Sequence, residues 1–133
     1  MGTARVQGQR DVGLNELPIR GLAINDATAN TAAVTVYASD SGILFVNKFA
    51  TAATYTLPAV ADAKGKMFWF YNVGAAGMVI KAPSAIMVAT NNAACTNATF
   101  GTANLMIGAG CMVFSDGTSY YLMGLGTSTI TPS

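Results

Sequence analysis

Histidine is absent from this sequence of 133 residues. The side chain that most often serves as metal ligand, proton shuttle and catalytic base is therefore missing. The six acidic residues are scattered along the chain, form no carboxylate pair and accompany no nucleophile motif. We predict that the protein is not an enzyme and that it has no catalytic, cofactor-binding or metal-binding residues.

Charged side chains are scarce as well. They make up 10% of the residues, against about 25% in an ordinary soluble domain. From residue 82 to residue 133, Asp116 alone is charged. A small domain normally relies on charge to stay apart from its neighbours, so this surface is expected to be covered by other protein. The net charge of +1, without a cluster of lysines and arginines, predicts no binding to nucleic acid.

Cysteine is limited to Cys95 and Cys111. A disulfide between them is possible, whereas a zinc site made of cysteines alone is excluded. We predict two buried, reduced thiols in a reducing compartment, and their pairing stays an open question at this point.

Neither a membrane span nor a signal peptide is expected. Residues 82–115 are uncharged and long enough to cross a bilayer. Pro83 and asparagines such as Asn91 and Asn97 would, however, leave costly polar groups in lipid. The first ten residues lack the apolar core of a signal peptide, so we expect no export by that route.

Residues 1–24 differ from the rest of the chain and are expected to form an extended arm. They hold five of the thirteen charges and several glycines. Pro18 favours extended backbone in the residue before it, Leu17. The apolar residues are too scattered for a helix; they are Val6, Val12, Leu14, Leu17, Ile19 and Leu22. Two interpretations remain open, namely docking onto a neighbouring subunit and a terminal strand that closes the protein's own sheet.

Residues 25–133 carry strand patterns throughout and are expected to form one domain. The expected strands are residues 33–37, 43–46, 54–57, 67–71, 78–81, 85–88, 105–107, 111–114 and 120–123. Residues 59–63 could form one helical turn, residues 91–104 a long loop or weak edge, and residues 124–133 a tail. Asp116 and Gly117 predict a tight hairpin turn.

The turns are expected to be structural. The glycine-rich residues 74–77 and 108–110 lack the following helix or lysine of a phosphate cradle, so we predict tight turns there. Asp40 and Asp116 stand in turn segments, where a carboxylate accepts hydrogen bonds from its own backbone.

The densest apolar segment is residues 67–71. In a strand, Phe68 and Phe70 share one face, and Met67, Trp69 and Tyr71 share the other. Both faces are then apolar, which places this strand in the middle of a sandwich whose second face is covered by another sheet or subunit.

Turns at a spacing of about ten residues predict an all-β fold, an antiparallel β-sandwich or jelly roll with an extended N-terminal arm. A solenoid is disfavoured because the sequence contains no exact internal repeat. Strand core is the simplest role for the aromatic residues, although some could instead form a platform for sugar rings. The platform residues would be Trp69, Tyr71, Tyr120 and Tyr121. The polar rim would come from Asn91, Asn92, Asn97 and Asn104.

Several segments between about residues 43 and 123 resemble a pattern common in virion proteins of tailed bacteriophages. These segments are residues 55–59, 65–70, 79–82, 109–110 and 114–121. Modules of this type occur in head decoration (cement) proteins and in tail fibres. The size of this chain, with a short arm and one β-body, is similar to that of cement proteins, which typically form trimers on the capsid shell.

The resemblance implies a structural virion protein that binds the expanded shell and stabilises the contacts between capsomers. Its implied partners are the major capsid protein and further copies of itself, as a homotrimer on the capsid exterior, assembled in the cytoplasm of the bacterial host. The implied core residues of the body are Phe68, Trp69, Phe70 and Tyr71. From charge placement on the arm, Arg5, Arg10 and Arg20 are expected to contact an acidic capsid neighbour, and Leu17 is a further expected partner-binding residue. The alternative is a tail-fibre or surface module that binds a receptor or glycan.

Overall fold

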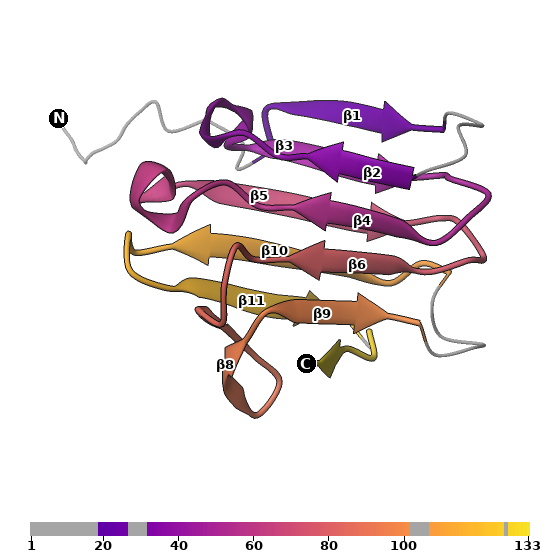
Figure 1. The fold of residues 1–133 in the computed structure, drawn as a ribbon. Helices are drawn as coiled ribbons and strands as arrows, with labels where there is room; N and C mark the ends of the chain where they lie inside the picture. Colours follow the sequence, from indigo (N-terminus) through magenta and orange to yellow (C-terminus); the bar gives the residue numbers. More distant parts are fainter. Residues whose placement is uncertain (1–18, 27–31, 102–106, 127) are drawn as a thin grey trace, which may run out of the picture.

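The computed structural model describes residues 19–26, 32–101, 107–126 and 128–133. These residues form two β-sheets that pack face to face, as Figure 1 shows. The seven-stranded sheet contains, in spatial order, β1 (Gly21–Asn25), β3 (Ile43–Asn47), β5 (Met67–Asn72), β10 (Gly110–Ser115), β11 (Tyr120–Leu125), β7 (Met87–Ala89) and β8 (Asn92–Cys95). The five-stranded sheet contains β12 (Thr131–Pro132), β9 (Asn97–Phe100), β6 (Met78–Lys81), β4 (Ala53–Thr56) and β2 (Ala32–Thr35). The predicted all-β sandwich is confirmed.

The first half of the body winds as a coil, contrary to the expected antiparallel pairing. Strands β1 to β6 alternate between the two sheets, so neighbouring strands within each sheet run in the same direction. Parallel neighbours need a long crossover, and here the strand of the opposite sheet provides it. A solenoid-like winding was disfavoured from the sequence, and for this half that prediction is wrong.

A ladder of asparagines marks each turn of the coil. Asn25, Asn47 and Asn72 end β1, β3 and β5 and lie opposite one another, after intervals of 22 and 25 residues. The side-chain amide of Asn47 donates to Oδ1 of Asn72 (2.7 Å), and the hydroxyl of Tyr55 donates to Oδ1 of Asn25 (2.9 Å). Asn47 and Asn72 are fully buried, so these bonds satisfy polar groups that would otherwise destabilise the interior.

The second half is antiparallel. β10 and β11 form the hairpin predicted at Asp116 and Gly117, and Gly117 adopts a positive φ of 92° in its turn. Residues 91–104 were expected to form a long loop or a weak edge: β8 agrees with the edge, since it is the last strand of its sheet, whereas β9 was not expected. Ala98 and Phe100 of β9 are fully buried, and this inward alternation makes β9 a strand beside β6.

The ends of the chain depart from the prediction too. The expected tail contains β12, which pairs with β9, and Ile130 just before it is buried. The predicted boundary at residue 24 falls inside β1, so residues 21–24 belong to the sheet and not to an arm. This agrees with the second of the two interpretations, a terminal strand, for that stretch. Residues 1–18 lie outside the described residues.

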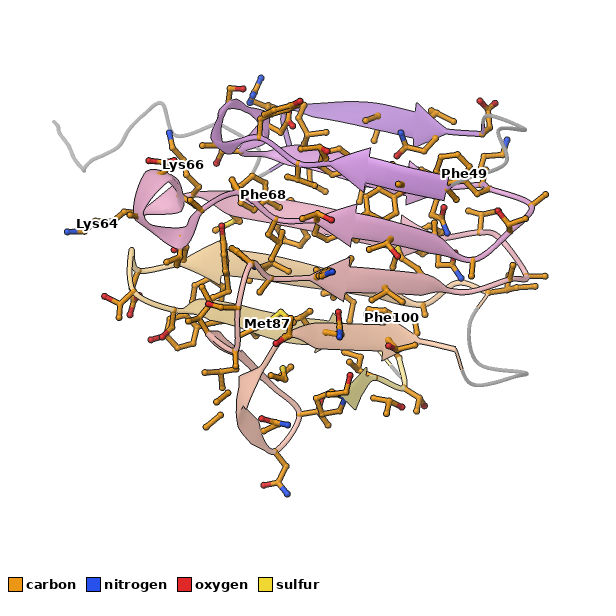
Figure 2. The ribbon with its side chains drawn as sticks, viewed as in Figure 1. Phe49, Lys64, Lys66, Phe68, Met87 and Phe100 are labelled. Carbon is orange, nitrogen blue, oxygen red and sulfur yellow. The ribbon has the colours of Figure 1, made fainter. Side chains whose placement is uncertain are left out.

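The core fills the space between the two sheets. Phe68, Met87 and Phe100 are fully buried in it, and Figure 2 shows Lys64 pointing away from the body beside the short 3-10 helix η2 (Val60–Ala63). Phe70 stacks on Phe45 at a centroid distance of 5.4 Å. Cys95 and Cys111 are buried and free, in agreement with the predicted thiols. Burial raises the pKa of both thiols.

Candidate interaction surface

Strand β5 presents aromatic residues to both sides of its sheet. Phe68 and Phe70 are fully buried between the sheets, whereas Tyr71 on the opposite side is 42% exposed. The implied core role is therefore confirmed for Phe68 and Phe70 and is wrong for Trp69 and Tyr71. The indole Nε1 of Trp69 is shielded from solvent and has no hydrogen-bond partner among the described residues.

The outward residues of neighbouring strands align with those of β5 in three rows. The first row is Met67, Phe114, Tyr121 and Val88. The second row is Leu22, Leu44, Trp69, Met112 and Met123. The third row is Ile24, Val46, Tyr71, Gly110 and Leu125. We call these three rows the apolar face; no charged residue belongs to it.

The apolar face is open to solvent at several points. Leu22 is 63% exposed, Met123 54% and Ile24 50%. An isolated exposed hydrophobic residue is ordinary, but a contiguous patch of this kind marks a contact surface. The pattern of residues 67–71 predicted the apolar second side of β5, but the rows across neighbouring strands appear only when distant strands are placed side by side.

Charged groups stand at the ends of these rows, among them Arg20 two residues before Leu22, Asp26 two residues after Ile24, and Asp116. Asp116, in the turn between β10 and β11, accepts hydrogen bonds from the backbone N–H groups of Ser119 and Thr118 (2.8 Å each) and from the Tyr121 hydroxyl (2.7 Å). The Ser119 bond first, then those from Tyr121 and Thr118, lower the pKa of Asp116 to about 2. Tyr121 in turn stacks on Phe114 at 5.3 Å. The carboxylate therefore fixes one corner of the apolar face.

The predicted turn roles of both aspartates are confirmed. Oδ2 of Asp40 accepts the backbone N–H of Tyr37 (2.8 Å) at the short 3-10 helix η1 (Ala38–Asp40). The glycine-rich residues 74–77 and 108–110 likewise contain turns, with positive φ angles at Gly77 and Gly108. These features hold the strands in place.

The outer face of the five-stranded sheet is different in chemistry. Its first row is Ala33, Thr54, Val79, Thr99 and Thr131. Its second row is Thr35, Thr56, Lys81 and Asn97. We call these two rows the threonine face. Lys81 is the one charged residue within the strands of the described part of the chain.

Of the predicted partner-binding residues, Arg20 alone is described. Its guanidinium donates from Nε to the carbonyl of Ser41 and from Nη2 to the carbonyl of Ser39, both at 2.6 Å. It therefore holds the turn at η1 within its own body. Arg5, Arg10 and Leu17 lie outside the described residues, and a partner role for all four stays a prediction.

The sugar platform is only partly assembled. Trp69, Tyr71 and Tyr121 share the apolar face, but Tyr120 is fully buried on the other side of its strand and donates to the carbonyl of Pro58 (2.6 Å). Burial, and to a lesser degree Asp62, raise the pKa of Tyr120 to about 12.

The asparagines expected to form a polar rim do not surround these aromatic residues. Asn91 lies in the turn between β7 and β8, at the end of the sheet. Asn92 accepts the backbone N–H of Ala94 (2.9 Å), and Asn97 belongs to the threonine face. Asn104 lies outside the described residues.

Within the described ranges, no group of three or more His, Cys, Asp or Glu side chains is placed to hold a metal ion. The same residues include no helix of the length and apolarity needed to cross a membrane. Comparison of the chain with protein-family models, curated proteins and solved structures gives no match.

Proposed function

We propose that this protein is a structural subunit of a bacteriophage virion, a capsid decoration protein that binds the major capsid protein and stabilises the contacts between capsomers. The observation that carries the proposal is the apolar face, because an uncharged surface of this extent needs a protein cover. The scarcity of charge across residues 82–133 supports the same conclusion. The phage-like segments described above supply the virion setting.

The proposed action is mechanical. A homotrimer on the capsid exterior would bridge adjacent capsomers and oppose the pressure of packed DNA. A protein that binds the expanded shell but not its precursor stabilises the expanded form by mass action. The rigid features of the sandwich, such as the buried asparagine ladder, suit such a clamp.

Purified virions from the source of the sequence test the proposal. We expect this chain in mature particles at a copy number that follows the shell lattice, as seen by mass spectrometry and electron microscopy. We also expect added protein to co-sediment with expanded shells and not with unexpanded ones. A chain that is absent from the particles would overturn the proposal.

A receptor- or glycan-binding module is the second candidate, because Trp69, Tyr71 and Tyr121 lie on one face. In that case a glycan array should show binding that Trp69→Ala or Tyr121→Ala abolishes while the circular dichroism spectrum is kept. Without such binding the decoration role stands alone.

A further inference from the structure

The apolar face is left open in the part of the chain that the structure describes. Five of the eight large apolar side chains that are exposed there lie on it; they are Leu22, Ile24, Tyr71, Met123 and Leu125. They come from strands at both sides of the sheet, so the exposed area extends from β1 to β11. A partner must therefore cover the sheet broadly and not at one pocket.

We infer that further copies of this chain cover the apolar face, sheet against sheet. This inference deepens the proposed self-association of the decoration protein by naming its surface, and it does not depend on capsid binding. The resulting contact would resemble the inside of a β-sandwich, in which two apolar sheet faces interdigitate.

Charge complementarity favours a copy of the chain over a different protein. Ordinary protein partners present mixed charges, and the three rows offer no lysine, arginine or carboxylate to pair with them. An apolar surface is instead complementary to itself, because every row that meets a copy meets another apolar row. Of the charges that border the rows, Asp116 is already satisfied by its own turn and by Tyr121, and Arg20 by the carbonyls of Ser41 and Ser39.

The size of the face is of the same order as a standard interface. Rows two residues apart across the five strands from β1 to β11 give a planar area of about 400 Å² at ordinary strand spacings. Large side chains project from this plane, so the accessible area is larger than the planar area. Each partner in a standard interface buries about 800 Å². Trp69 lies on the central strand of this area and Met112 on the strand beside it, near the centre where large residues contribute most to binding.

The test compares charge on the two outer faces. Leu22→Lys with Met123→Lys places two charges on the apolar face at exposed positions. The matched control, Ala33→Lys with Thr35→Lys, places the same charge at exposed positions of the threonine face. Sedimentation velocity across a range of concentrations measures the association of the wild type and of both variants. Circular dichroism and thermal unfolding confirm that both variants are folded.

We expect wild type and control to associate and the apolar-face variant to dissociate, with association weakened about 100-fold or more. Trp69 is the single tryptophan and provides a second readout. Its fluorescence should shift to longer wavelength when the wild type is diluted and should be insensitive to dilution in the apolar-face variant. Wild-type protein that is monomeric at all concentrations, or an apolar-face variant that associates as the wild type does, would overturn the inference.

The same data separate this inference from the proposed function. A trimer that dissociates in the apolar-face variant supports both the face and the proposed stoichiometry. A dimer with the same dependence supports the face and contradicts the trimer. Failure to bind expanded shells contradicts the decoration role and leaves the result on self-association unchanged.

Discussion

The two outer faces of the sandwich share one backbone geometry and differ in their side chains. On the five-stranded sheet, outward positions such as Thr54 and Thr99 are polar while inward positions such as Tyr55 and Ala98 are buried. This is the usual alternation of a sheet with one solvated face. On the seven-stranded sheet both the inward Phe70 and the outward Tyr71 are aromatic. The contrast distinguishes an apolar outer face from a largely polar one.

Strand formation alone does not account for the difference. Both sheets contribute to one core, and strands of both contain parallel pairs from the same coil. Outward threonines satisfy the β-propensity of one sheet as well as leucines and methionines satisfy that of the other. The proposed self-association gives the apolar residues on the seven-stranded sheet a role outside the fold of the single chain.

The largest effect is expected when a substitution on the buried side of β5 is compared with one on its outward side. Phe70→Ala should lower the free energy of unfolding by about 3–5 kcal/mol, because it opens a cavity in the shared core. Tyr71→Ala should cost less than about 1 kcal/mol in the dissociated chain, because its side chain is largely at the surface. Urea denaturation at low protein concentration measures both. Equal losses would show that Tyr71 belongs to the core and would remove the contrast between the faces.

The asparagine ladder lies in the interior that both faces share. Asn47→Ala should destabilise the protein by about 2–3 kcal/mol, because it deletes the buried hydrogen bonds to Asn72 and to the carbonyl of Gly77. Asn25→Ala, at the edge strand, is the matched control. It should cost about 1 kcal/mol, because the Tyr55 hydroxyl keeps Oδ1 of Asn47 within 3.4 Å. Thermal unfolding compares the two, and a larger loss for Asn25→Ala would contradict this account of the ladder.

Local sequence patterns were sufficient for the strands and turns that depend on neighbouring residues. The alternation in residues 67–71 predicted β5 and its two faces, and Asp116 with Gly117 predicted the hairpin. The buried thiols followed from the general preference of cysteine for the interior. Each of these features is determined within a few residues of sequence.

The coil and the apolar rows depend on register between distant strands, and local patterns do not carry that information. Asn25, Asn47 and Asn72 do form a repeat, but unequal intervals hide it from a search for exact copies. A search for strands that end in asparagine would have revealed it. In the same way β9 was missed because Asn97 and Thr99 face outward and dilute the signal of Ala98 and Phe100.

The opposite substitution makes the threonine face apolar and tests whether an apolar outer face is enough to cause association. Thr54→Ile with Thr99→Ile extends an apolar row through Val79, which lies between the two threonines. The stability of the single chain should change by less than about 1 kcal/mol, because isoleucine also suits an outward strand position. We expect new, higher-order assembly by light scattering, since both faces can then bind copies. Thr54→Ser with Thr99→Ser is the polar control and should behave as wild type.

The smallest effect concerns the corner that Asp116 fixes beside the apolar face. Its pKa in the folded protein, about 2, is below the ordinary value of 3.8, so the folded state favours the ionised carboxylate. The stabilisation is therefore complete above about pH 4 and is lost as the pH falls through about 2. Asp116→Asn should lower the melting temperature slightly at pH 5, and the difference from wild type should shrink towards pH 2.

The threonine face has no carboxylate in its rows, so Thr56→Asn should show a difference that is independent of pH across this range. A difference for Asp116→Asn that is also constant with pH would mean that the hydrogen bonds from Ser119, Thr118 and Tyr121 do not depend on its charge.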